Sequence, residues 1–340
     1  MNGNGSQAEG APAIVVEGLV KRFGDVVAVD GVDFNVPAGT VLGLLGPNGA
    51  GKTTIVRMLT TILRPDQGRA TVLGLDVVQR PHAVRSVIGL AGQYAAVDEA
   101  LTGRENLRMM GRLTHSPKPT INARADELLE RFALTPAADR PVRTYSGGMR
   151  RRLDLAAALV HRPRVLFLDE PTTGLDPPGR SDLWTLIVEL VAEGTTLLLT
   201  TQYLEEADRL SDNIIVIDGG RIVASGSSSQ LKSRLGTTVV EVRFPEPEPA
   251  QMASRRLSII GTAELLEDGR TVSVAVPDAG AAVLEVVRLL DSSGLSPESL
   301  RVREPTLDDV FLQLTGHKAE SQEAQPDDKK RAGRGVRGAA

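Results

Sequence analysis

A glycine-rich segment has the residue types needed to hold the phosphates of a nucleotide. Residues 46–53 read GPNGAGKT, which fits the pattern G-x-x-x-x-G-K-[ST] between an apolar run and a predicted helix. The glycines let backbone N–H groups curl around phosphates, and the following helix directs its positive end at them. Lys52 is expected to bridge the β- and γ-phosphates and Thr53 to hold Mg²⁺. The predicted nucleotide contacts are Gly46, Pro47, Asn48, Gly49, Ala50, Gly51, Lys52, Thr53 and Thr54. The alternative, a glycine-rich turn that happens to contain a lysine, is disfavoured by the strand–loop–helix context.

Two acidic residues follow at the end of another apolar run, Val165–Asp169. Such a run is typical of a strand buried on both faces of a parallel sheet, and ligands bind at the carboxyl ends of these strands. Asp169 is expected to hold Mg²⁺ through water, and Glu170 is a candidate general base for the attacking water. Together with Lys52 they predict a site that hydrolyses a nucleoside triphosphate. The alternative is that the two acids only cap a helix.

A second possible phosphate site lies at Ser146, Gly147 and Gly148, where a helix is expected to begin. Ser-Gly-Gly alone is a weak signal and is usually just a cap. Here the serine stands at the N-cap and the glycines leave room for a phosphate at the helix end. Because the chain already has one phosphate loop, a second one suggests that it faces a nucleotide held by another copy.

The composition of the sequence limits the classes of function that the protein can have. At 340 residues the chain is long enough for two domains. Its 39 basic and 43 acidic residues are balanced, so no general attraction to nucleic acid is expected. The sequence has no cysteine, which excludes disulfides and Cys-ligated zinc or iron–sulfur sites. The longest apolar runs are far below the roughly 20 residues that span a bilayer, so we expect a soluble chain whose membrane role depends on a partner.

Strands alternate with helices over most of the chain, which predicts an α/β core with a mostly parallel sheet. Strands are expected at 14–23, 32–36, 41–45, 165–169, 195–201, 213–218 and 221–224. Helices are expected at 54–63, 121–133, 146–161, 183–191 and 203–210, and 83–113 is expected to be mostly helical. Residues 1–13 are predicted to be a disordered leader.

The character of the sequence changes near Gly236, and residues 237–316 are predicted to form a small α+β domain. Strands are expected at 238–244 and 271–276, a helix at 283–290, and a stiff extended loop at 245–249 because prolines alternate there. Residues 317–340 lack apolar periodicity and are predicted to be a disordered tail.

In order and spacing these motifs resemble the ATP-binding cassette (ABC) ATPase family over about residues 14–230. The nucleotide loop and the acidic strand match directly. The family's signature motif reads YSGGM at 145–149, where the family usually has leucine first and glutamine last. The resemblance implies an α/β P-loop ATPase of ABC type, with a mostly parallel core sheet, an antiparallel β subdomain and a helical subdomain. The nucleotide-binding domain would cover 14–235 and its helical subdomain about 94–160.

The resemblance also gives roles to residues that carry little signal of their own. It places Phe23 against adenine, and Gln93 at Mg²⁺ and the transport subunit. It places Asp176, with Gly174 and Leu175, in a loop through which two copies communicate. Taken alone, Gln93 and Phe23 read as ordinary core or surface residues.

One departure from the family bears on catalysis. After the strand at 195–201 the family usually has a histidine that contacts the γ-phosphate, and here the residue is Gln202. A glutamine amide can donate a hydrogen bond but carries no titratable proton. We expect Gln202 to sense the γ-phosphate without an acid–base role, which leaves Glu170 as the base. The alternative is a degraded switch and a slow ATPase.

Residues 200–208 and 304–311 resemble the daunorubicin-resistance type of drug-exporter ATPase, in which glutamine is common at this place. This implies a membrane-associated subunit on the cytoplasmic side of the cell membrane, in which two copies sandwich two ATP with Mg²⁺. A separate integral membrane permease would export a drug, antibiotic or lipid-like molecule, and no nucleic acid partner is expected.

Other functions are weighed against this one. The ATPase of an importer stays open, because its core chemistry is the same. A soluble ABC ATPase acting on ribosomes or DNA is disfavoured, because the sequence has one nucleotide loop and no long heptad run. A GTP switch would need an Asn-Lys-x-Asp motif, which the sequence lacks.

Overall fold

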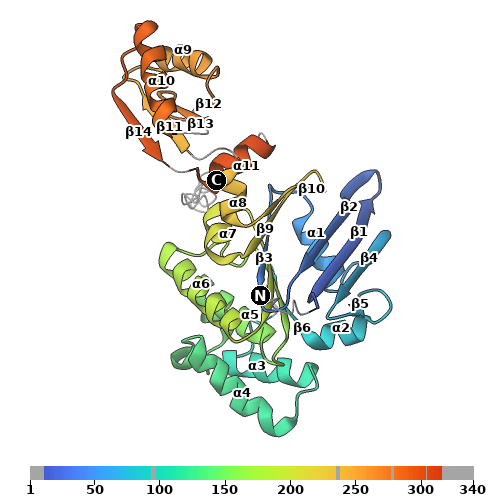
Figure 1. Cartoon of the computed structure of the whole chain (residues 1–340). Helices are drawn as coiled ribbons and strands as arrows, with labels where there is room; N and C mark the ends of the chain where they lie inside the picture. Colours follow the sequence, from blue (N-terminus) through green and yellow to red (C-terminus); the bar gives the residue numbers. More distant parts are fainter. Residues whose placement is uncertain (1–10, 93–96, 235–237, 277–278, 304, 316–340) are drawn as a thin grey trace, which may run out of the picture.

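Three β-sheets organise the chain. The computed structural model describes residues 11–92, 97–234, 238–276, 279–303 and 305–315. A six-stranded sheet lies at the centre, an antiparallel four-stranded sheet lies beside it, and a second four-stranded sheet stands at the C-terminal end (Figure 1). Helices α3 (Gly103–Leu113) and α4 (Lys118–Arg131) lie at the opposite end of the molecule.

The central sheet has the order β10-β9-β3-β8-β7-β6. Its strands are β3 (Val41–Leu45), β6 (Ile88–Ala91), β7 (Val165–Asp169), β8 (Thr196–Thr201), β9 (Asn213–Asp218) and β10 (Arg221–Gly226). Neighbouring strands are parallel except β9 and β10, which form an antiparallel hairpin. Every residue of β3, β7 and β8 is buried, as expected for strands covered on both faces. The predicted α/β class with a mostly parallel core sheet is confirmed.

Alternate side chains of the central strands enter two different cores, as the two-residue period of a strand requires. Leu166 and Leu168 of β7 pack in one core with helices α5 (Gly147–Ala158) and α6 (Pro177–Ala192). Val165 and Phe167 pack in the other core with α1 (Lys52–Leu59) and the antiparallel sheet. The carboxyl ends of β3, β7 and β8 therefore lie together between the two layers.

The antiparallel sheet has the order β2-β1-β4-β5. Its strands are β1 (Ile14–Phe23), β2 (Val26–Val36), β4 (Gln67–Val72) and β5 (Leu75–Asp76). Helix α2 (Pro81–Val87) follows this sheet in the chain, and the one-turn helices η1 (Thr135–Ala137) and η2 (Val142–Thr144) follow α4. Helices α7 (Leu204–Leu210) and α8 (Ser228–Ser233) flank the β9–β10 hairpin.

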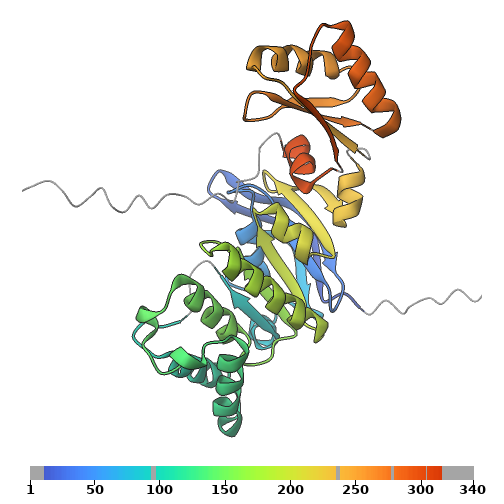
Figure 2. The same ribbon diagram turned by 90° about the vertical axis from the view of Figure 1, so that its left-hand side faces the viewer.

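The C-terminal sheet has the order β12-β13-β11-β14, with all neighbours antiparallel. Its elements are β11 (Thr238–Arg243), α9 (Pro247–Leu257), β12 (Thr262–Leu265), β13 (Thr271–Val276), α10 (Ala279–Ser292) and β14 (Ser299–Arg303). This βαββαβ order is that of a ferredoxin-like fold. Helices α9 and α10 pack on the sheet through a core of its own, away from the central sheet (Figure 2).

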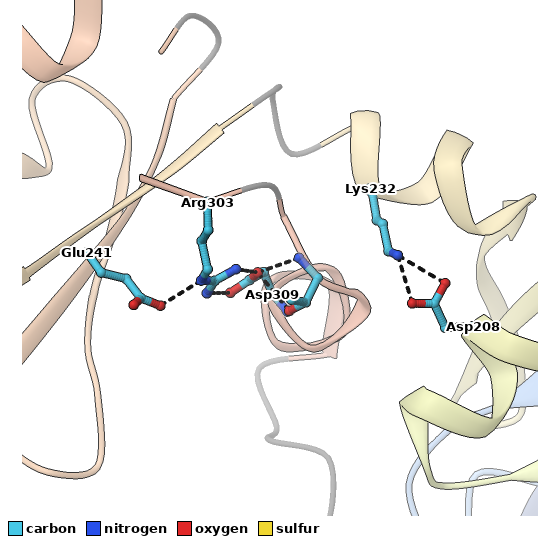
Figure 3. Close-up of polar contacts among 6 residues, drawn as sticks. Asp208, Lys232, Glu241, Arg303 and Asp309 are labelled. Carbon is cyan, nitrogen blue, oxygen red and sulfur yellow. Dashed lines mark hydrogen bonds and ion pairs between the residues drawn. The ribbon is translucent and has the colours of Figure 1, made fainter. Parts of the chain in front are cut away.

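The last helix, α11 (Leu307–Thr315), leaves this sheet and returns to the nucleotide-loop half of the molecule. Leu307, Val310 and Phe311 are buried in one cluster with residues of β3, α7, β9 and α8. Arg303 of β14 reaches Asp309 of α11 at 2.7 Å and Glu241 of β11 at 2.6 Å (Figure 3). The buried face of α11 and this ion-pair triad join the C-terminal sheet to the core.

Several expectations about individual elements were wrong. The stretch 83–113 contains the strand β6 between α2 and α3, and β2 begins at Val26 instead of Val32. Pro247 begins helix α9, so 245–249 is not one extended loop. Proline suits the first helical position because its missing N–H has no partner to lose there. Ala13 is buried and its N–H donates to Val36, so it belongs to the folded part and not to a disordered leader. The rest of the predicted leader up to residue 10 and the predicted tail at 317–340 lie outside the described residues.

Candidate functional site

The nucleotide loop joins β3 to α1, and its backbone explains its glycines. Gly51 is the N-cap of α1 with φ of 107°, a conformation that side chains disfavour. A Cβ on Gly46 would lie 2.3 Å from the carbonyl oxygen of Ile217, and one on Gly51 would lie 2.4 Å from that of Ala28. Both glycines are therefore required by close backbone contact. The resulting loop leads into the N-terminal end of α1, and the first N–H groups of a helix, which have no partner within the helix, can bind an anion.

Lys52 lies inside this loop. Its side chain is 4% exposed, and Nζ donates to the carbonyls of Gly46 and Pro47 at 2.7 and 3.0 Å. The ammonium is thus held within the curl of the backbone, where the phosphates are predicted. The remaining predicted contacts, Asn48, Gly49, Ala50, Thr53 and Thr54, lie in the same loop and in the first turn of α1.

Asp169 ends β7 beside the loop. Its Oδ1 accepts hydrogen bonds from Thr53 Oγ1 at 3.1 Å and from Thr200 Oγ1 at 2.5 Å. The hydroxyl of Thr53, in the first turn of α1, and the carboxylate of Asp169, at the end of β7, therefore converge at one point. Both are the hard oxygen ligands that Mg²⁺ prefers. Thr200 was not predicted as a site residue, although it is a hydroxyl near the end of a fully buried strand.

Glu170 follows in an uncommon backbone conformation, with φ of 51°. Its N–H donates to the carbonyl and the hydroxyl of Thr200, each at 3.1 Å. Thr173 Oγ1 lies 3.4 Å from its Oε2, and the residue is 8% exposed. The turn after β7 is thus held against the end of β8, directly after Asp169 in the chain.

Ser146 is the N-cap of α5, and its Oγ accepts from the N–H of Met149 at 3.3 Å. The next two residues are Gly147 and Gly148, and neither has a positive φ. A Cβ on Gly147 would meet nothing within 4 Å, and one on Gly148 would meet only Leu175 at 3.7 Å. Glycine in a helix costs about 1 kcal/mol relative to alanine. Among the residues that the structure describes, no contact explains these two glycines, whereas a close approach from outside would.

The other predicted site residues lie on separate elements. Asp176 is the N-cap of α6 and accepts from the N–H of Gly179 at 3.2 Å. Gln202 lies between β8 and α7, and its Oε1 is buried without a hydrogen-bond partner in the described part of the chain. Phe23 ends β1 with 48% of its surface exposed, and Lys21 Nζ lies 5.6 Å from its ring centre. Gln93 lies outside the described residues.

Two protein families match the chain. Residues 29–173 match the family described as ABC transporter. Residues 226–315 match the family described as ATP-binding protein DrrA1-3-like, C-terminal domain. Together they cover the nucleotide loop, the acidic strand and the C-terminal sheet with α11.

Relatives of known name match nearly the whole chain. The daunorubicin resistance ATP-binding protein DrrA3 of Streptomyces coeruleorubidus is 53% identical over 312 residues, which are 92% of this chain and 98% of the relative. The Nod factor export ATP-binding protein I of Ralstonia nicotianae is 41% identical over 307 residues, 90% of this chain and 94% of the relative.

Solved structures show the same architecture. The cbiO1 subunit from Clostridium perfringens, part of the ABC transporter complex cbiONQ, aligns with a TM-score of 0.60 at 28% identity, over 73% of this chain and 96% of that one. An ATP-binding subunit of an ABC transporter aligns with a TM-score of 0.60 at 26% identity, over 65% of this chain and 92% of that one. Within the described residues, no helix has the length and apolarity to cross a bilayer.

Proposed function

Since the chain belongs to the ABC transporter family and is the ATP-hydrolysing subunit of an exporter, we propose that two copies close head to tail around two ATP molecules. Each ATP would lie between the nucleotide loop of one copy, with Lys52, and the α5 end of the other, with Ser146. The nucleotide-binding domain at 14–235 supplies both surfaces, and the accessory domain at 237–316 lies outside the shared sites.

The observation that carries this proposal is the pair Gly147 and Gly148. They have normal helical backbone and free space around them, yet they are glycine at the exposed start of a helix. A phosphate reaching the α5 N-terminus from outside would need that space and would meet the positive end of the helix. The chain's own phosphate loop is at α1, so a second copy is the natural source of the nucleotide.

The residues of one site divide the work of hydrolysis. Lys52 and the loop N–H groups bind the β- and γ-phosphates, and Phe23 stacks on adenine through its exposed ring. Mg²⁺, held by Thr53, by Gln93 and through water by Asp169, would neutralise charge on the phosphates. Glu170 takes the proton of the attacking water. Gln202 donates to the γ-phosphate from the end of β8, and Asp176 contacts the other copy.

The membrane subunit, and not this chain, would select the transported molecule. Because relatives are named for daunorubicin resistance and for Nod factor export, we assign an amphiphilic drug, antibiotic or lipid-like substrate to this exporter. An integral membrane permease subunit would carry it, with this chain bound at the cytoplasmic face of the membrane. ATP binding would close the dimer and hydrolysis would reopen it, and these movements would drive the conformational change of the permease.

Mixing two inactive variants tests the shared site. Lys52→Ala removes the loop cation, and Ser146→Arg blocks the α5 end, so each homodimer has no intact site. In a mixed dimer one site combines the unaltered loop of one copy with the unaltered α5 end of the other. Mixing equal amounts should restore up to about a quarter of wild-type hydrolysis, because half the dimers are mixed and each has one intact site of two. If the mixture stays as inactive as its components, the two surfaces do not share a nucleotide.

A further inference from the structure

The side chain of Arg151, in the second turn of α5, has no role in the scheme above. Its guanidinium donates to four main-chain carbonyls on two other segments. Nε donates to Pro171 at 2.7 Å, and Nη2 donates to Asp169 and Glu170 at 3.2 and 3.0 Å. Nη1 donates to the carbonyl of Gly92. One planar side chain therefore binds both the turn that carries the two acids and the end of β6.

This geometry bears directly on Glu170. The three successive carbonyls at 169–171 converge on one guanidinium, across the same turn in which Glu170 has φ of 51°. A left-handed conformation is unfavourable for a non-glycine residue and persists only where surrounding contacts hold it. Thr200 accepts a hydrogen bond from the N–H of Glu170, and Arg151 donates one to its carbonyl oxygen, so both peptide groups of Glu170 are fixed.

Arg151 is also a cation among buried acids. Its side chain is 13% exposed, and Nη1 lies 3.6 Å from Oδ2 of Asp154, which is 2% exposed. Burial lowers the pKa of Arg151, and the charges of Asp154, Glu206, Asp169 and Glu170 act in the opposite direction. An arginine keeps its charge under these conditions, because a guanidinium is not deprotonated in proteins. It therefore offsets the repulsion among carboxylates that the predicted site brings together.

The position of Arg151 in the chain connects these contacts to the α5 end. Four residues separate it from Ser146 along one rigid helix. Gly92 directly precedes Gln93, the residue that the family resemblance places at Mg²⁺ and the transport subunit. A shift of α5 would thus be transmitted by one side chain to the acidic turn and to Gly92 at the end of β6.

On the basis of the function proposed above, we infer that Arg151 is a positioning residue that couples contact at the α5 end to hydrolysis. Its guanidinium holds Glu170 in place for the attacking water. When a second copy's nucleotide binds at the start of α5, Arg151 moves with the helix and so adjusts the position of Glu170. Arg151 acts through main-chain carbonyls and touches no phosphate in this scheme. Its loss should therefore change kcat and leave ATP binding almost unchanged.

Two substitutions and one control test the inference in the full chain. Arg151→Lys keeps a cation among the acids but has no planar fork. Its kcat should fall about ten- to hundredfold, because misplacing a catalytic group by about 1 Å has an effect of that size. Its KM for ATP should stay within about twofold, because ground-state contacts are intact. Arg162→Lys is the control, since that side chain is 73% exposed and pairs with Glu127 at the surface.

Chemical rescue separates positioning from simple stabilisation. Millimolar guanidinium added to Arg151→Ala should raise kcat in a saturable way, while wild type and Arg162→Ala should not respond. If Arg151→Ala fails to fold, the lysine variant alone decides the case. An Arg151→Lys protein with wild-type kcat, or with kcat reduced only in proportion to its folded fraction, would overturn the inference. A mixture of Lys52→Ala and Ser146→Arg that stays inactive would instead overturn the proposed function.

Discussion

Thr200 Oγ1 donates a hydrogen bond of 2.5 Å to Oδ1 of Asp169, so the end of β8 orients the acid at the end of the neighbouring strand β7. The same hydroxyl accepts from the N–H of Glu170 at 3.1 Å. A single buried side chain thus fixes the predicted metal ligand and the predicted general base relative to each other. The residue between this hydroxyl and Gln202 is Thr201, which accepts from the N–H of Tyr203 at the start of α7.

Thr200→Val should therefore reduce the rate of hydrolysis without preventing ATP from binding at the nucleotide loop. The isosteric valine leaves Asp169 with one partner fewer in a buried place, which costs about 1–3 kcal/mol of folding free energy. We expect kcat to fall about tenfold or more, because both acids lose part of their orientation. Steady-state ATPase kinetics and urea unfolding measure the two effects.

Thr196→Val on the same strand is the matched control. Thr196 is 2% exposed and its Oγ1 accepts from Gly39 at 2.9 Å, at the end of β8 far from the acids. Its replacement should cost a similar stability and leave kcat unchanged. Equal loss of kcat in both variants would mean that hydrolysis merely follows stability.

Gln202 should act as a hydrogen-bond donor that does not titrate. Gln202→Ala should lower kcat about ten- to hundredfold, because a hydrogen bond to a charged group contributes about 1.5–3 kcal/mol. Gln202→His should retain activity and add an inflection near pH 6.5 to the kcat profile, because histidine titrates there. If the profiles of wild type and Gln202→His coincide, residue 202 does not contact the reacting phosphate.

Phe23 offers a test of adenine stacking. It ends β1 and is 48% exposed, and its partner across the hairpin is Val26, which is 65% exposed. Phe23→Ala should weaken ATP binding about tenfold, because stacking of a base on an aromatic ring contributes about 1–3 kcal/mol. Val26→Ala should leave ATP affinity unchanged. Calorimetric titration with ATP measures both, and equal affinities for the two variants would remove Phe23 from the site.

The sequence predicted the parts of the site that are local in the chain. The nucleotide loop and the acidic strand carry their own patterns, and the structure places both at one edge of the central sheet. Strand β6 escaped prediction because its four residues gain their strand conformation from pairing with β7, far away in sequence. Arg151 escaped because its partners are carbonyls of residues 92 and 169–171, and a main-chain acceptor has no residue type to recognise. Gln93 stays a prediction.

Helix α11 should contribute strongly to the stability of the core to which it returns. Phe311 is 2% exposed in a cluster with Leu204 and Ala207 of α7, whereas Leu314 on the same helix is 37% exposed. Phe311→Ala should destabilise the protein by about 3–5 kcal/mol, as is usual for a buried aromatic, and Leu314→Ala by much less. The single tryptophan, Trp184, donates to Glu206 of α7 at 3.2 Å and reports the transition by fluorescence. Equal effects of the two substitutions would contradict this packing.

His161 should make stability depend on pH in the range of histidine titration. Its Nε2 lies 2.8 Å from the carbonyl oxygen of Ile88, so it joins the segment after α5 to β6, and burial lowers its pKa below the usual 6.5. Between that lowered pKa and 6.5 the unfolded chain binds the proton more readily than the folded chain does, so unfolding is favoured as the pH falls. The contribution of His161 is therefore fully present above pH of about 6.5 and is lost as the pH falls through the folded-state pKa.

The unfolding free energies of wild type and His161→Gln, measured by urea at pH 7.5 and at pH 5.5, isolate this residue, because other groups titrate alike in both proteins. The advantage of wild type should shrink at the lower pH, and an advantage that stays constant or grows would show that His161 is not held neutral in the folded protein.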